Sequence, residues 1–332
     1  MFRPLVIALA VCAASSARAE ESLAFEGRLS LAPGWDTNVG RQSAGPGVVA
    51  DAALSALAAL DLRWQPADGH LTSASWHGGT RVFADHGAED QVAHVLTAGH
   101  ALRFADAWVG AVRVRRRDQR LRSGARDASD TAGQLSLRWE VARRFAPELR
   151  LGWRRFDWWP DERWSGAGPT AGLGIEVRPF ARHRAEAGWE AQVRTHPERR
   201  EISQHGHLAW SWRGPVLLSG GYLLGFAESD VAGFAHVRHR LHLLLGAHLP
   251  LELMLGAQAV LQLVRFPEGF RLDQFAVADD EETLSSLSLK LARPIGAGLS
   301  LEARYQLHLA TFVKADLAYE RHLLGTAVTW RF

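Results

Sequence analysis

Long apolar runs are missing from this 332-residue sequence, and cysteine, lysine and tyrosine are scarce. The most apolar stretch beyond the amino terminus, 241–255, is interrupted by histidine, proline and glutamate, so it could not cross a bilayer as a helix. The single cysteine, Cys12, lies within residues 1–19, which excludes disulfides and thiolate metal sites from the rest of the chain. A net charge of only +2 argues against nucleic acid as a partner.

Residues 1–19 have the three parts of a secretory signal peptide. Arg3 gives a positive start, 5–14 form a short apolar centre, and Ala17-Arg18-Ala19 provides a small-x-small cleavage site. Val11 is bulky for the position before a lipidated cysteine, so we do not expect lipidation. The sequence predicts export, with residues 20–332 as a single domain.

The exported part alternates apolar and polar residues over segments of about ten residues, the length of a tilted transmembrane strand. Between 251 and 263 the odd positions are leucine or alanine, while Glu252, Gln258 and Gln262 share the even positions. Successive side chains of a strand point to opposite faces, so each segment has one apolar face. The predicted strands are 23–31, 50–64, 70–83, 92–104, 108–116, 134–144, 148–156, 170–178, 185–194, 202–212, 216–226, 234–248, 251–264, 283–291, 299–311 and 322–332.

Short turns and longer polar loops alternate between these segments. The longer loops are expected at 32–48, 117–133, 158–168 and 266–282, the last with the acidic run 279–282. Soluble strands of about 5–6 residues would not sustain such alternation, and a membrane sheet must close to leave no unpaired edge. The pattern therefore predicts an all-β, antiparallel up-and-down transmembrane barrel of about 16 strands (14–18), with both termini and the short turns in the periplasm.

The last predicted strand ends in Phe332, on the same face as Leu324, Val328 and Trp330. This ending resembles the last strand of Gram-negative outer-membrane barrels, in which the terminal aromatic residue is part of the insertion signal. The resemblance implies an outer-membrane location. It also implies contact with outer-membrane lipid, lipopolysaccharide and the barrel-assembly machinery.

Tryptophan gathers near the ends of the predicted strands, as in the aromatic girdles of membrane barrels. These residues are Trp64, Trp108, Trp139, Trp153, Trp158, Trp210, Trp212 and Trp330. For Trp158, Trp159 and Trp164, which fall on a predicted loop, a platform for stacking sugars is the alternative.

Arginine supplies nearly all the positive charge on the faces expected to point inward, because lysine occurs only at Lys290 and Lys314. The inward arginines outnumber the inward acids by roughly two to one in this assignment, which favours anions in the lumen. The alternative is that arginine and glutamate pair across strands and fill the interior. The predicted pore-lining residues are Arg113, Arg115, Arg138, Arg154, Glu190, Arg194, Arg238, Arg240, Glu252 and Arg304.

Catalytic and cofactor signatures are absent from the sequence: it has no HExxH, GxSxG, P-loop or dinucleotide fingerprint. Inward histidines such as His205, His207 and His236 could ligate a metal, but polar lining is the simpler interpretation. We expect no enzyme activity, no cofactor and no metal.

Gly34-Trp35-Asp36-Thr37-Asn38-Val39 resembles a stretch near the start of barrels involved in exopolysaccharide secretion and surface-lipoprotein assembly. That resemblance implies a pore for polysaccharide export, working with periplasmic export components. The leading functional hypothesis is therefore passage of a hydrophilic, anionic solute or polymer, ahead of general diffusion. The alternatives are a docking barrel with a filled lumen and an outer-membrane hydrolase.

Overall fold

A computed structural model of the chain describes residues 22–41, 48–141, 144–231, 234–267, 285–310 and 318–332. The predicted signal peptide and the acidic run 279–282 lie outside the described residues. Within them, the chain forms sixteen strands and two short 3₁₀ helices, η1 (Gly87–Glu89) and η2 (Glu162–Trp164). No helix in these ranges is long and apolar enough to cross a membrane.

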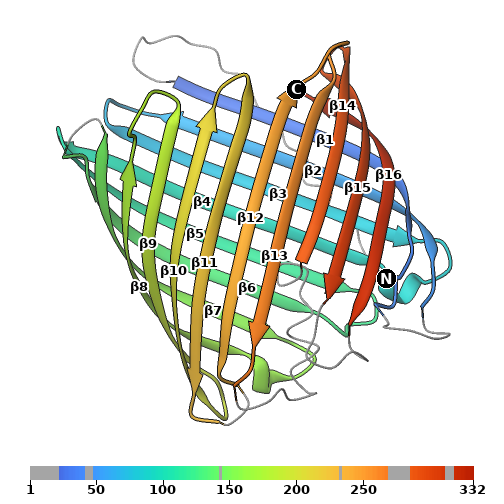
Figure 1. The fold of residues 1–332 in the computed structure, drawn as a ribbon, viewed down its shortest axis with the longest axis horizontal. Helices are drawn as coiled ribbons and strands as arrows, with labels where there is room; N and C mark the ends of the chain where they lie inside the picture. Colours follow the sequence, from blue (N-terminus) through green and yellow to red (C-terminus); the bar gives the residue numbers. More distant parts are fainter. Residues whose placement is uncertain (1–21, 42–47, 142–143, 232–233, 268–284, 311–317) are drawn as a thin grey trace.

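Each strand pairs antiparallel with its neighbour in sequence, and β1 pairs with β16, which closes the barrel (Figure 1). The strands are 12 to 15 residues long. Their bounds are β1 (Ser22–Asp36), β2 (Asp51–Gln65), β3 (His70–Phe83), β4 (Gln91–Ala105), β5 (Trp108–Leu121), β6 (Ala128–Trp139), β7 (Phe145–Trp158), β8 (Gly166–Val177), β9 (His183–Thr195), β10 (Arg200–Arg213), β11 (Val216–Ser229), β12 (His236–His248), β13 (Met254–Arg265), β14 (Ser285–Gly296), β15 (Leu299–Ala310) and β16 (Tyr319–Arg331).

The predicted fold is confirmed, since every predicted segment overlaps one strand in order. Two expected loops are shorter than predicted. β1 continues to Asp36, and only 122–127 separate β5 from β6 where we expected a loop over 117–133. The end of β5 escaped detection because its outward positions Arg116, Asp118 and Arg120 are charged, so the apolar alternation stops before the strand does.

The two ends of the barrel differ in their connections. The turn end carries tight links such as 66–69, 106–107, 214–215 and 297–298, and Figure 1 places the carboxy terminus there. The loop end carries the connections that hold η1 and η2. With periplasmic termini, as the sequence predicts, the turn end faces the periplasm and the loop end faces outside.

The outer face is apolar and exposed, and the inner face is polar. Leu135, Leu208 and Leu173 are 61%, 62% and 58% exposed, whereas Gln192, Glu176 and Glu302 on inward faces are at most 7% exposed. A belt of exposed leucine and valine around a polar interior is unfavourable in water and favourable in a bilayer. Two members of the expected aromatic girdle, Trp108 and Trp139, lie at the turn end, where their outward rings stack with centroids 5.4 Å apart.

Candidate functional site

The lumen wall is the candidate functional site, because the inward faces of the strands bring many charged side chains together. Nine of the ten predicted pore-lining residues lie on strands, at the parity opposite to exposed apolar neighbours such as Val114, Trp153 and Leu241. They are Arg113 and Arg115 on β5, Arg138 on β6, Arg154 on β7, Glu190 and Arg194 on β9, Arg238 and Arg240 on β12, and Arg304 on β15.

The prediction for Glu252 is wrong in its placement. β12 ends at His248 and β13 begins at Met254, so Glu252 lies in the turn between them. Leu251 and Glu252 both have positive φ, 63° and 59°, a conformation that bends the chain back sharply. Leucine at 251, 253 and 255 continues the apolar alternation of the strand through this turn. The predicted strand therefore began at 251, before the actual start of β13.

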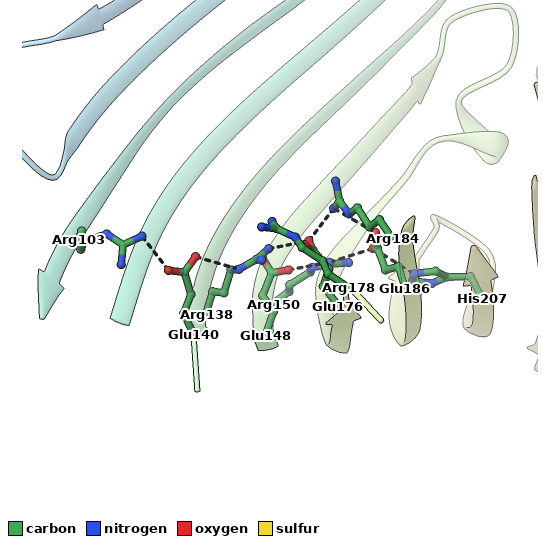
Figure 2. A network of polar contacts seen from close by, with 10 residues as sticks. All are labelled: Arg103, Arg138, Glu140, Glu148, Arg150, Glu176, Arg178, Arg184, Glu186 and His207. Carbon is green, nitrogen blue, oxygen red and sulfur yellow. Dashed lines mark hydrogen bonds and ion pairs between the residues drawn. The ribbon is translucent and has the colours of Figure 1, made fainter. Parts of the chain in front are cut away.

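A ladder of alternating charges runs along the inner wall near the turn end (Figure 2). It starts with Arg103 on β4, whose guanidinium lies 2.7 Å from the Glu140 carboxylate. Arg138 on β6 then links Glu140, at 3.7 Å, to Glu176 on β8, at 3.0 Å. This part of the wall is close to neutral, because each arginine has a carboxylate beside it.

The ladder continues across β8, β9 and β10. Arg178 and Arg184 lie 2.7 and 2.8 Å from Glu176, which is only 5% exposed. Glu186 then contacts Arg150, at 3.6 Å, and His207, at 3.5 Å. A buried carboxylate with three arginines around it keeps its charge, since each arginine offsets the cost of removing it from water.

Nearer the loop end the balance shifts toward positive charge. Arg154 is held by both oxygens of Asp130, at 2.8 Å each, and Arg194 lies 3.9 Å from Glu201. Three other arginines, Arg240, Arg194 and Arg154, act electrostatically on Arg238, and so does the acid Glu201. The buried Nε atom of Arg238 has no hydrogen-bond partner in the part of the chain that the structure describes. We call Arg154, Arg194, Arg238 and Arg240 the arginine cluster.

A second basic surface faces the lumen on the opposite side, over β1 to β5, β15 and β16. There a cavity of about 400 Å³ is walled mainly by small side chains such as Ala53, Ser55 and Gly79. Four arginines reach it: Arg28, Arg81, Arg117 and Arg304. Arg304 is neutralised by Glu302, which also binds Lys290 at 2.8 Å. Space and positive charge therefore coincide on this wall.

Three connections at the loop end meet through aromatic rings. Trp164, in the connection between β7 and β8, packs on Phe234, between β11 and β12, with centroids 5.5 Å apart. Arg199, between β9 and β10, lies 4.2 Å from the Phe234 ring. Trp158 and Trp164 are only 6% and 8% exposed, so they are structural here and do not present a platform for sugars.

His196 lies outside the strands, 6% exposed, with its Nε2 atom 3.4 Å from Nη2 of Arg199. Burial, reinforced by the charge of Arg199, lowers the pKa of His196 to about 4. The imidazole is therefore neutral at physiological pH. Among the described residues, no group of three or more histidine, cysteine or acidic side chains is placed to hold a metal ion.

The stretch from Gly34 to Val39 closes the barrel, a role that the sequence did not suggest. Asp36 binds the Arg321 guanidinium of β16 with both carboxylate oxygens, each 3.0 Å from Nε. The Asn38 side chain donates to the Glu320 carbonyl, and the His322 backbone N–H donates to the Thr37 hydroxyl. At the other end of this seam, Phe332 exchanges two backbone hydrogen bonds with Gly27. The terminal residue thus extends the pairing of β16 with β1.

Comparison with known proteins identifies the fold alone. No protein-family model matches the sequence, and no curated protein is significantly similar to it. An anion-selective porin from Comamonas acidovorans is similar in structure with a TM-score of 0.53, at 11% identity over 94% of this chain and 100% of that one. CdiB from Acinetobacter baumannii gives a TM-score of 0.55 at 8% identity, over 93% of this chain and 60% of that one. A bacterial polysaccharide outer-membrane secretin gives a TM-score of 0.48 at 10% identity, over 93% of this chain and 98% of that one. This TM-score is too low to support an argument.

Proposed function

We propose that this barrel is an outer-membrane channel that favours hydrophilic anions, with an acidic polysaccharide on its way out of the cell as the leading cargo. The arginine cluster is the observation that carries the proposal. It places four inward arginines on β7, β9 and β12, and the acids that contact them in this region are Asp130 and Glu201. In a lumen with low-dielectric walls, such an excess raises the local concentration of anions and repels cations.

The two basic surfaces support a path for a long anion. The arginine cluster lies on β7, β9 and β12, and the basic cavity lies on the opposite wall. A polymer with regularly spaced carboxylates or phosphates could contact both walls in turn, whereas a small anion would use one at a time. Arginine suits this task because its planar fork binds carboxylate and phosphate with two hydrogen bonds. Periplasmic export components would deliver the polymer to the turn end.

A second candidate, a docking barrel with a filled lumen, is favoured by the charge ladder of Figure 2. Paired side chains across β4 to β10 stiffen that wall and reduce the space for cargo. The absence of catalysis is part of our proposal, and assays for lipid and peptide hydrolysis by the refolded protein would test it.

Conductance of the refolded protein in a planar bilayer, under a salt gradient, separates the two candidates. We expect steady openings, and the sign of the reversal potential should show that anions pass more readily than cations. The preference should weaken as salt rises, because the Debye length falls from about 10 Å at 0.1 M to about 3 Å at 1 M. A barrel that folds but never conducts would favour docking.

Charge reversal tests which residues set the preference. Arg238→Glu with Arg240→Glu should turn anion preference into cation preference, since it replaces two inward positive charges by two negative ones. Arg200→Glu with Arg265→Glu is the matched control, because both side chains lie near the loop end on outward faces. Equal selectivity in wild type and the lumen variant, or an equal change in the control, contradicts the proposal.

A further inference from the structure

Charged side chains occupy part of the outer face of the barrel, where lipid is expected. Trp76 of β3, Leu96 of β4 and Arg116 of β5 are register partners in one row across the outside. The row continues through Thr131 of β6 to Arg155 of β7. The adjacent row toward the turn end, with Val114 and the 56% exposed Trp153, is still apolar. The charges thus begin where the apolar belt ends.

The positive member of each ion pair on this surface is the exposed one. Arg116 binds Asp118 with two hydrogen bonds, of 2.8 and 3.0 Å, yet its side chain is 54% exposed and that of Asp118 only 7%. Arg155 and Asp157 repeat the pattern, at 65% and 24%. The more buried aspartates hold the guanidinium groups in place, and the arginines are the side chains accessible from outside the barrel. We call Arg116, Arg155 and the neighbouring Arg120 the outer arginine patch.

An apolar groove lies directly beside this patch. Its volume is about 620 Å³, and its outward lining includes Leu31, Ala56, Ala58, Gly78, Thr80 and Val92. A polar pocket of about 400 Å³, lined by Arg116, Asp118 and Arg120, shares Trp76 and His94 with the groove. One molecule that contacts both needs an anionic head and an apolar tail.

We propose that this surface binds a phosphorylated glycolipid of the outer leaflet, the lipid A part of lipopolysaccharide, with a phosphate on the outer arginine patch and an acyl chain in the groove. Arginine pairs with phosphate through two parallel hydrogen bonds, and interfacial tryptophan suits the level of the headgroups. The patch lies near the loop end, which faces outside, so the outer leaflet supplies the ligand. The site faces away from the lumen and does not depend on the proposed transport function.

Native mass spectrometry of the refolded full chain in detergent tests the proposal. The probes are bis-phosphorylated lipid A, the same lipid without phosphates, and phosphatidylglycerol. Wild-type protein should retain bis-phosphorylated lipid A at least about ten-fold better than either of the other two lipids. The dephosphorylated lipid has no phosphate for the arginines to bind, and in phosphatidylglycerol the phosphate and the acyl chains are spaced differently. Equal retention of the dephosphorylated lipid, or preference for phosphatidylglycerol, overturns the proposal. This comparison needs no variant, so it holds even if one fails to fold.

Variants locate the site on the outer face. Arg116→Gln with Arg155→Gln should reduce retention of lipid A by about ten-fold or more, because two phosphate-binding forks are removed. The control, Arg200→Gln with Arg265→Gln, removes two other outward arginines near the loop end and should retain lipid A as wild type does. Equal losses in the two double variants would show general attraction to charge. Self-association through this face, seen as dimers that lipid A does not disperse, would assign it to a second copy instead.

Discussion

Replacing Asp36 by asparagine tests how much one buried ion pair contributes to the closed barrel. The Asp36 and Arg321 side chains are 0% and 5% exposed, and they join the first strand to the last. Asparagine keeps an oxygen for the hydrogen bond that the Asn38 backbone N–H donates to Asp36 Oδ1. The substitution therefore removes the charge and little else.

The expected loss follows from the guanidinium left behind. The buried arginine loses the carboxylate that binds it with both oxygens, and breaking such a pair costs about 3–5 kcal/mol of the free energy of unfolding. Replacing both partners by neutral side chains, as in D36N with R321M, removes the buried positive charge as well. We expect that double variant to recover at least half of the loss, because contacting residues are not additive.

Unfolding in denaturant, followed by tryptophan fluorescence and by the mobility shift of the folded barrel in gels, measures these changes. Asp161→Asn is the control. It breaks an arginine–aspartate pair of the same chemistry in the exposed connection that holds η2, and exposed pairs contribute little. A loss in D36N no larger than in D161N would refute the reasoning. So would a D36N/R321M variant whose loss equals the sum of the two single losses.

Two further predictions concern packing and pH. A Cβ at Gly168 would overlap the Val193 carbonyl oxygen, whereas one at Gly133 would meet nothing within 4 Å. Gly168→Ala should therefore lower the free energy of unfolding by about 1–3 kcal/mol and Gly133→Ala should leave it nearly unchanged, in the same denaturant assay; equal effects would contradict the close approach of β8 and β9. Because the pKa of His196 is lowered to about 4, the unfolded chain takes up a proton there first as pH falls below 6.5, and stability is lost between pH 6.5 and 4. At pH 5 this amounts to about 2 kcal/mol, and His196→Gln should reduce the drop between pH 7 and pH 5; an unchanged drop would show that other groups cause it.

The sequence by itself determined the strands and which side chains of each strand point inward. Alternation has a period of two, and the bilayer imposes it on every strand, so Arg154, Arg194, Arg238 and Arg240 could be placed on the lumen face from parity alone. Parity also located Phe332 at the end of the last strand. It failed where apolar residues continue through a turn, as at Glu252, or where charges replace apolar residues on the outer face, as at Asp118 and Arg120.

The tertiary structure alone decided which charges meet. Arg138 binds Glu176 across 38 positions and Arg321 binds Asp36 across 285, and both depend on the register of strands that no local pattern encodes. The same holds for the neutral ladder near the turn end, for the excess of arginine near the loop end, and for the outer arginine patch beside an apolar groove. Local periodicity fixes the direction in which a side chain points, because it follows from the geometry of one strand. The partners of that side chain depend on closure of the whole sheet, because the pairing of β1 with β16 constrains the register of the strands around the barrel.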